Sequence, residues 1–503
     1  MVGETAVAKP APQATFSRVP DWESSLQHLE VVLDSSPVFT NNPSNSMNPP
    51  RRVALISHSS ALSGGEQALL RAVRALGGSG YLPHVVLPGP GPLRQVLESL
   101  GVPVAELATA WWIPATHWSA EVFRAQLVGL EQRTEALGRW LAAERIDLVH
   151  TNTVVTLEGA LAAAGRRLPH VWHSRGLFDG GFPPSFFGEL RGIFETITAL
   201  ADVMPCVSRA VADQARCHEP DSPCRLVPDG FDLGEPGSRP PAPRAEVAAR
   251  LGVPINRRLV VSLGGIQRRK GLLDLVDAAG KLARQFSDVV FILGGSDNDP
   301  THTQELRGRI AALGLEARVL LPGQIADPAS LLSHAELFVH PSHSEGFGLA
   351  ILEAMALARP VIATRCGGPE DLIESGRSGL LVDVGNADQL AEAIRVLLGD
   401  PVRAARMGEE AGRQARRFDL QTLGDNLDRA YSEACERHAS RGRLGRGQRL
   451  WIASEVLGSA LGRAASPPGA ASGAPLVRSP FGSALLTMSR VACARRPRPG
   501  SGG

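Results

Sequence analysis

Residues 336–382 read ELFVHPSHSEGFGLAILEAMALARPVIATRCGGPEDLIESGRSGLLV, and this stretch decides the fold. The short apolar run 337–339 ends at His-Pro-Ser, which predicts a buried strand that enters a loop. Residues 349–358 are rich in Leu, Ala, Met and Glu, which are good helix formers. A second apolar run, 360–363, predicts another strand. Strand, loop, helix and strand in this order indicate a parallel α/β sheet.

The loop before this helix carries the residues for chemistry. Glu345 comes just before the helix, and the backbone N–H groups from Gly346 onward, together with the helix dipole, can bind an anion. Glu353 follows eight residues later, so two carboxylates can contact one ligand at separate points. A carboxylate beside a phosphate site commonly accepts hydrogen bonds from sugar hydroxyls. These features predict a nucleotide-sugar site.

The Glu345/Glu353 pair, set in PSHSEGFGLAILEAMALARPVIAT and followed by GGPEDLI and SGLLV, resembles the donor-site signature of retaining glycosyltransferase family 4. The resemblance covers about residues 52–436. It implies a GT-B fold, in which two doubly wound, Rossmann-like α/β domains face a central cleft. It also implies that Glu345 orients the transferred sugar and Glu353 binds the ribose. The backbone expected to line the donor is that of Gly346, Phe347, Gly348 and Leu349.

The second predicted domain begins with a strand at 259–263, the turn Gly264-Gly265 and a helix at 271–286. In the family this turn carries an arginine soon after the glycine and then a Lys-Gly pair, both of which reach the donor diphosphate. Lys270 matches the lysine and is expected to act in catalysis. Gly265 stands where the arginine is expected, so Arg268 or Arg269 is a possible substitute. These cations and the loop N–H groups would stabilise the leaving diphosphate without a cofactor or an obligatory metal.

The first predicted domain begins with a strand at 52–57, a loop and a helix at 66–76. Gly64 and Gly65, in the segment SGGEQ, resemble the family's glycine loop beside the acceptor and the donor phosphates. His173, at the end of the strand that begins at 170, resembles the histidine that approaches the transferred sugar. His150 and His170 are the alternatives for that histidine.

The chain is divided into six predicted segments. Residues 51–233 form the acceptor-side domain, 234–258 the linker and 259–415 the nucleotide-sugar domain, and a helix over 416–436 crosses back to the first domain. Residues 1–50 are a Pro-, Ser- and Asn-rich extension that predicts disorder. Residues 437–503 form a basic, low-complexity tail.

Composition limits the partners and the compartment. The formal net charge is +1, and the tail holds eleven arginines against one glutamate, so it carries 11 − 1 = +10 and the rest of the chain carries 1 − 10 = −9. An acidic body does not predict a nucleic-acid partner. Six scattered cysteines and the lack of a long apolar run predict a cytoplasmic protein. The tail is also compatible with contact to the inner face of an anionic membrane.

The predicted function is transfer of a sugar from a nucleoside-diphosphate sugar to a glycan, lipid-linked or small-molecule acceptor, in cell-envelope polysaccharide or glycoconjugate synthesis. Other enzymes on the same architecture are a nucleotide-sugar epimerase and a phosphorylase, and the latter would need a pyridoxal-binding lysine. A non-catalytic nucleotide- or glycan-binding protein is a further alternative, supported by the glycine at position 265. Trp111, Trp112 and Trp118 could stack on sugar rings or serve only packing.

Overall fold

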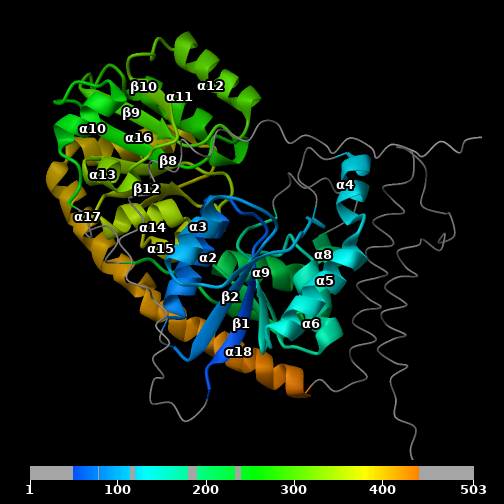
Figure 1. Cartoon of the computed structure of the whole chain (residues 1–503). Coiled ribbons are helices and arrows are strands. Elements are labelled where there is room, and N and C mark those ends of the chain that lie inside the picture. The colour runs from blue at the N-terminus through cyan, green and yellow to red at the C-terminus, as the bar shows by residue number, and fades with distance from the viewer. Residues whose placement is uncertain (1–48, 78, 114–118, 179–189, 233–239, 441–503) are drawn as a thin grey trace, which may run out of the picture.

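The structure, a computed structural model, describes residues 49–77, 79–113, 119–178, 190–232 and 240–440. The predicted extension and tail therefore lie outside the described residues, apart from 49–50 and 437–440. Figure 1 shows two α/β units, joined along one side by the last helices of the described chain.

The first unit contains a five-stranded parallel sheet in the order β3-β2-β1-β4-β5. From β1 the strands are added toward one edge of the sheet as far as β3, and from β4 they are added toward the other edge. The topological switch point therefore lies between the adjacent strands β1 and β4, and the loops that follow these two strands lie side by side. A short parallel pair, β6-β7, extends this unit, with one bridge from Val171 in β5 to Val203 and one from Ser174, two residues after β5, to Cys206. The strands are β1 (Arg51–Ile56), β2 (Tyr81–Leu87), β3 (Val104–Glu106), β4 (Leu148–Thr151), β5 (His170–Trp172), β6 (Met204–Cys206) and β7 (Cys224–Leu226).

Helices cover both faces of this sheet because the central strand β1 is apolar on both sides. Val53 and Leu55 pack against α2, α3 and the C-terminal helix α18 (Leu420–Ser440), whereas Ala54 and Ile56 pack against α5 and α6. The helices of this unit are α2 (Gly64–Ala75), α3 (Pro92–Ser99), α4 (Ala120–Leu127), α5 (Leu130–Ala143), α6 (Glu158–Arg166), α8 (Leu190–Leu200) and α9 (Arg209–His218).

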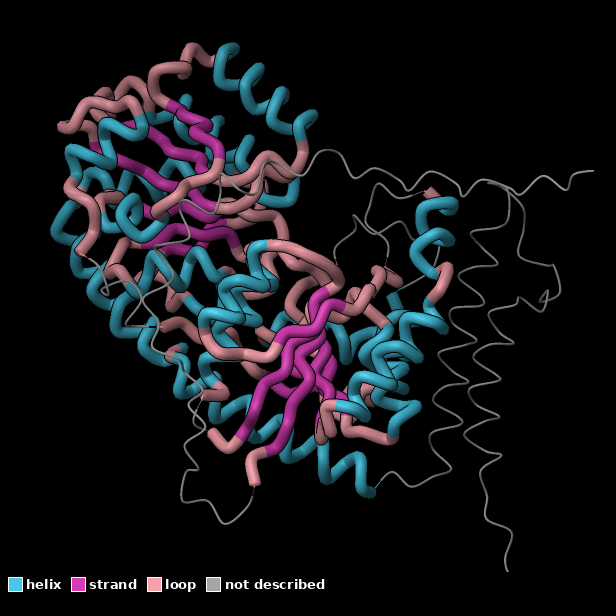
Figure 2. The backbone as a smooth tube through the Cα atoms, viewed as in Figure 1, coloured by secondary structure: helices cyan, strands magenta, loops and turns pink. Residues whose placement is uncertain are grey.

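The second unit contains a six-stranded parallel sheet in the order β10-β9-β8-β11-β12-β13. Its reversal point lies between β8 and β11; Lys270 lies in the loop after β8 and Glu345 in the loop after β11. Figure 2 shows the strands of both sheets running between layers of helices. The strands are β8 (Arg258–Leu263), β9 (Val289–Gly294), β10 (Val319–Gly323), β11 (Leu337–His340), β12 (Val361–Thr364) and β13 (Leu380–Val382).

Two groups of helices cover this second sheet. Val260 faces α11, α12 and α16, and Val261 faces the side of α10, α13, α14 and α17. Helix α10 lies inside the predicted linker, and Arg244 ties it to the second unit through the carbonyl oxygen of His334 (2.9 Å). The helices are α10 (Arg244–Leu251), α11 (Leu272–Leu282), α12 (Pro300–Ala312), α13 (Pro328–Ser333), α14 (Leu349–Ala356), α15 (Pro369–Leu372), α16 (Ala387–Gly399) and α17 (Pro401–Ala415), with a 3₁₀ turn, η3, at Arg268–Lys270.

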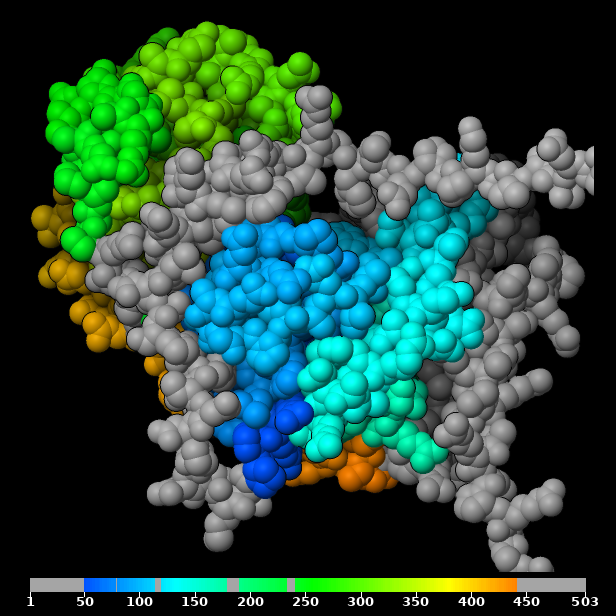
Figure 3. Space-filling view, viewed as in Figure 1, coloured from blue at the N-terminus to red at the C-terminus, as the bar shows by residue number. Residues whose placement is uncertain are grey.

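The chain returns to the first unit at its described C-terminal end. After the 3₁₀ turn η4 (Arg416–Phe418), helix α18 (Leu420–Ser440) buries Leu427 and Tyr431 in the core of the first unit. Beside η4, the backbone N–H of Phe231 donates to the carbonyl of Phe418 (2.7 Å). Figure 3 shows the orange surface of α17 and α18 beside the second unit and below the first. Among the described residues, no helix is long and apolar enough to cross a bilayer.

Candidate active site

Glu345 is fixed in the loop between β11 and α14. Its backbone N–H donates to the carbonyl of Cys366 (3.2 Å), and its carbonyl accepts from the N–H of Gly368 (2.8 Å), so the loop after β12 holds it from one side. In the side chain, Oε2 accepts from Lys270 Nζ (2.6 Å) and from His340 Nε2 (3.0 Å). Oε1 has no hydrogen-bond partner among the described residues, and it is not sealed from solvent. One carboxylate oxygen is therefore held by the protein and the other is available.

The charge state of Glu345 follows from its neighbours. Burial alone would raise the pKa of its carboxyl, but the ammonium of Lys270, the hydrogen bond from His340 and the guanidinium of Arg269 outweigh burial and hold that pKa well below its usual value. Glu345 is therefore an ionised hydrogen-bond acceptor at neutral pH.

The three predicted cations after β8 take different positions. Lys270 contacts Glu345 directly, and its side chain is only 14% exposed. Arg269 donates to the carbonyl of Ser344 (3.2 Å), beside Glu345. Arg268 turns away and pairs with Glu305 on α12, with 59% of its side chain exposed. The structure thus brings Lys270 and Arg269 to Glu345 and leaves Arg268 outside this cluster.

The two glycines that precede this turn lie close to other loops. Gly264 has a φ of +150°, and a Cβ on it would lie 3.5 Å from Cε of Lys270. A Cβ on Gly265 would lie 2.4 Å from Nδ2 of Asn298. Asn298 therefore occupies the space into which a side chain at position 265 would project.

The loop that leads into α14 presents its backbone. The N–H groups of Gly346, Phe347 and Gly348 have no acceptor among the described residues. The ring of Phe347 is buried against Phe418 (5.7 Å between centroids), so only its backbone atoms can serve a ligand here, and the partly buried side chain of Leu349 packs on the same core. A Cβ on Gly346 would lie 2.4 Å from the carbonyl oxygen of Arg175, which shows how closely the two units meet at this loop.

Glu353 pairs with a cation of the other unit. Nη2 of Arg71, on α2, donates to Oε1 of Glu353 (2.7 Å), and the Arg71 guanidinium lies over the ring of Phe231 at 5.1 Å. The Arg71 side chain is 6% exposed and that of Glu353 is 30% exposed. Glu353, the residue predicted to bind the ribose, thus also links the two units of the structure.

His173 lies in a buried polar chain. Its Nδ1 is 3.2 Å from both Nη2 of Arg175 and Nε2 of His150, and Nδ1 of His150 is 2.7 Å from the hydroxyl of Tyr431. An arginine can only donate, so Nδ1 of His173 is an acceptor and the proton lies on Nε2. Burial, then Arg175 and His150, hold the pKa of His173 well below its usual value, and the nearby carbonyl of Val227 opposes this shift without forming a hydrogen bond.

His173 therefore has a defined tautomer but no exposed surface. The contact with sugar or acceptor that the resemblance implies is not visible in this arrangement and stays a prediction. The alternatives are equally enclosed. His150 bonds Tyr431, and Nε2 of His170 bonds Thr151 (2.9 Å).

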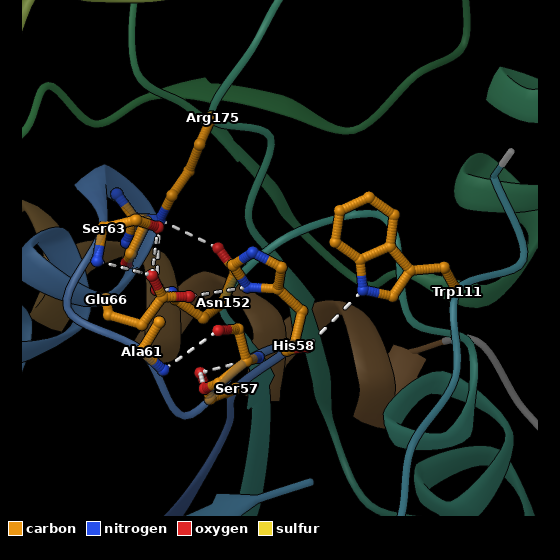
Figure 4. A network of polar contacts seen from close by, with 10 residues as sticks. Ser57, His58, Ala61, Ser63, Glu66, Trp111, Asn152 and Arg175 are labelled. Carbon is orange, nitrogen blue, oxygen red and sulfur yellow. Dashed lines mark hydrogen bonds and ion pairs between the residues drawn. The ribbon is translucent and has the colours of Figure 1, made fainter. Parts of the chain in front are cut away.

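The glycine loop of the first unit forms the start of α2, two residues earlier than the sequence predicts. The N–H groups of Gly64 and Gly65 have no acceptor among the described residues, but the buried carboxylate of Glu66 accepts from the N–H of Ser63 (3.1 Å) at the same helix end. Figure 4 shows Glu66 between Ser63 and His58, whose Nδ1 lies 3.3 Å from Glu66 Oε1. A resident carboxylate weakens this helix end as an anion site, so its role toward phosphate stays a prediction.

Several polar residues in and around the site escape sequence reasoning. Figure 4 shows Asn152 beside Arg175, whose Nε donates to the backbone carbonyl of Asn152 (2.8 Å). The side-chain amide of Asn152 donates to the carbonyl of Gly65 (2.9 Å), and Arg175 also pairs with Asp229. Only their positions after strands could have pointed to them. Among the described residues, no group of three or more His, Cys, Asp or Glu side chains is placed to hold a metal ion. That no metal is required stays a prediction.

Comparison with known proteins gives this geometry a family. Residues 62–235 match the sequence model described as Glycosyltransferase Family 4, and residues 244–414 match Glycosyl transferases group 1. D-inositol 3-phosphate glycosyltransferase of Xylanimonas cellulosilytica is 31% identical over 314 residues, which cover 60% of this chain and 70% of that protein. The chain belongs to glycosyltransferase family 4. Alpha-maltose-1-phosphate synthase of Mycobacterium tuberculosis is 33% identical over 325 residues, covering 58% of this chain and 81% of that protein.

Solved structures confirm the predicted GT-B fold of this family 4 glycosyltransferase. Anabaena HepE in complex with UDP and glucose has a TM-score of 0.63 and 26% identity, and the match covers 76% of this chain and 99% of HepE. Sucrose-phosphate synthase from Thermosynechococcus elongatus has a TM-score of 0.60 at 22% identity and shows the fold alone. The predicted enzyme class, a glycosyltransferase that uses a nucleotide-sugar, is confirmed. Nothing in these comparisons supports the epimerase alternative.

Proposed function

We propose that this glycosyltransferase moves a hexosyl group from a UDP-sugar to a hydroxyl of a small-molecule or glycan acceptor, with retention of configuration. The observation that carries the proposal is the state of Glu345, with Oε2 held by Lys270 and His340 and Oε1 available. Uracil is the proposed base because HepE, solved with UDP and with UDP-glucose, is 24–26% identical to this chain.

In this proposal the second unit holds the donor. Oε1 of Glu345 accepts hydrogen bonds from hydroxyls of the sugar, and Glu353 accepts from the ribose. The diphosphate faces Lys270, Arg269 and the N–H groups after Glu345, which stabilise the charge that develops as it leaves. The bond from the anomeric carbon to the phosphate oxygen breaks, and the bond to the acceptor oxygen forms on the same face. The acceptor proton passes to the departing diphosphate.

The test is release of nucleoside diphosphate from UDP-, GDP- and ADP-sugars in the presence of an acceptor panel. The panel includes inositol phosphates and sugar phosphates because the names of two relatives contain such compounds. We expect turnover of a UDP-sugar by the wild type, loss of at least about 100-fold in Glu345→Ala, and no change in Glu316→Ala, which removes an exposed carboxylate of the same unit. Failure to turn over any donor would refute the proposal.

The finer setting of the reaction is also proposed. It is the synthesis of cell-envelope polysaccharide or glycoconjugate on the cytoplasmic side, with peripheral contact to an anionic membrane through the arginine-rich tail. Removal of residues 441–503 should abolish binding to vesicles that contain anionic lipid and should leave donor turnover intact. Equal vesicle binding with and without these residues would refute the membrane contact.

A further inference from the structure

His340 is a second buried partner of Glu345. It ends strand β11, is 2% exposed, and places Nε2 3.0 Å from Oε2 of Glu345 and 2.9 Å from Oγ of Ser342. Because Glu345 is ionised, Nε2 must carry a proton for this contact to be favourable. Burial lowers the pKa of His340, so the ring is neutral and donates from Nε2.

Lys270 and His340 bind the same oxygen but differ in their freedom to move. Lys270 is the last residue of the 3₁₀ turn η3, and its ammonium is carried by a flexible four-carbon chain. His340 belongs to a strand paired with β12, and two residues later the carbonyl of Ser342 accepts from Oγ1 of Thr364. An incoming diphosphate attracts the lysine ammonium and leaves the neutral imidazole in place.

We infer that His340 is the positioning residue that keeps Oε2 of Glu345 occupied when Lys270 turns to the donor diphosphate, so that Oε1 stays directed at the transferred sugar. This inference rests on the proposed function. Without His340, Oε2 would lose its remaining partner at the moment of reaction, and the carboxylate could rotate about its last torsion. The loss should therefore affect the turnover step more than nucleotide binding.

The test compares full-length wild type with His340→Leu, His340→Gln and His302→Leu, on the UDP-sugar that the wild type turns over. His302→Leu is the matched control, because His302 is equally buried (2%) in the same unit and contacts a different carboxylate, Glu305. In His340→Leu we expect kcat to fall about 10–100-fold, the usual range for a lost hydrogen bond to a charged group, and the Kd for UDP to stay within about twofold. His340→Gln retains an N–H donor and should recover part of kcat.

A pH profile separates positioning from packing. In His340→Leu the acidic limb of kcat/KM should move to higher pH, because the hydrogen bond that helps to lower the pKa of Glu345 is gone. Wild-type kcat in His340→Leu would overturn the inference. So would equal losses in the Leu and Gln variants with an unchanged pH profile.

A measurement without donor keeps the two proposals apart. The unfolding midpoints of His340→Leu, Glu345→Gln and the double variant should be non-additive, because the two side chains are in direct contact. Additive shifts would contradict the inference. Non-additive shifts in a protein that turns over no donor would instead refute the proposed function and support the contact.

Discussion

Replacing Lys270 with methionine removes the main counter-charge of Glu345 and leaves its carboxylate in place. Removal of one partner of a buried ion pair typically costs about 3–5 kcal/mol. The side chains of Lys270 and Glu345 are 14% and 16% exposed, and His340 still donates to the carboxylate. We therefore expect a loss at or just below the lower limit of this range, about 2–3 kcal/mol, which corresponds to a fall of about 4–12 °C in the unfolding midpoint for a unit of this size.

The pH dependence of this loss has a definite sign. In the wild type the pKa of Glu345 is held well below its usual value. The contribution of this carboxylate to stability is therefore constant above the pKa that the same carboxyl has in the unfolded chain, and it is lost only in acid. Without Lys270 the largest cause that opposes burial is gone, so the pKa of Glu345 in the folded protein rises. Below the raised pKa the folded variant takes up a proton that the folded wild type does not. The difference in free energy of unfolding between wild type and variant then shrinks by about 1.4 kcal/mol for each pH unit.

The assay is the unfolding midpoint of wild type, Lys270→Met and Lys281→Met between pH 5 and pH 8. Lys281 pairs with Asp388 at the surface, where the side chains are 47% and 84% exposed, so this control should lose less than about 1 kcal/mol. A deficit for Lys270→Met no larger than that of the control, or one that grows toward pH 5, would refute the reasoning.

Three further predictions concern donor binding and the backbone. Arg269→Ala should weaken UDP binding about tenfold or more in calorimetry, and Arg268→Ala should leave it within about twofold, because only Arg269 lies beside Glu345; equal effects would contradict this placement. Glu353→Ala should weaken UDP binding about tenfold, since a ribose hydroxyl loses a charged acceptor, and unchanged affinity would exclude the ribose contact. Gly271→Ala should abolish soluble folding or lower the unfolding midpoint far more than the control Gly376→Ala. Both glycines have positive φ, but only at Gly271 would a Cβ lie 1.9 Å from a backbone oxygen, that of Pro341. Similar midpoints for the two variants would contradict this prediction, because they would show that the loop at Pro341 moves to accommodate the Cβ.

Much of the fold was predictable because both sheets are parallel and buried. Such strands are continuous apolar runs, and the runs at 259–263, 337–339 and 360–363 correspond to β8, β11 and β12. Helix ends were less predictable. The sequence predicts that Gly64 and Gly65 lie in a loop before the helix. In the structure the hydrogen bond from the N–H of Ser63 to the carboxylate of Glu66 caps the helix, and both glycines belong to α2.

The candidate site was predictable only where its residues belong to one sheet. Glu345, Lys270 and the N–H groups after Glu345 follow neighbouring strands of one sheet, so their meeting follows from the chain order. Arg71 could not be paired with Glu353 from sequence, because they lie 282 residues apart on different units. His340 reads as an ordinary strand end, and only the fold shows its ring against Glu345.

The choice between Arg268 and Arg269 likewise needed coordinates. Adjacent residues in a 3₁₀ turn point about a third of a turn apart, so one can face the site while the other faces α12. The sequence does not distinguish the two arginines, whereas in the structure Arg268 pairs with Glu305.

The central claim, that Glu345 contacts the transferred sugar and not the nucleotide, is tested most directly by Glu345→Gln. UDP affinity by calorimetry and turnover of the UDP-sugar are measured on the same protein sample. We predict that UDP binds no more weakly than to the wild type, since Lys270 is released toward the diphosphate, and that turnover falls at least about 100-fold. Turnover close to wild type, or a loss confined to UDP affinity, would contradict the account.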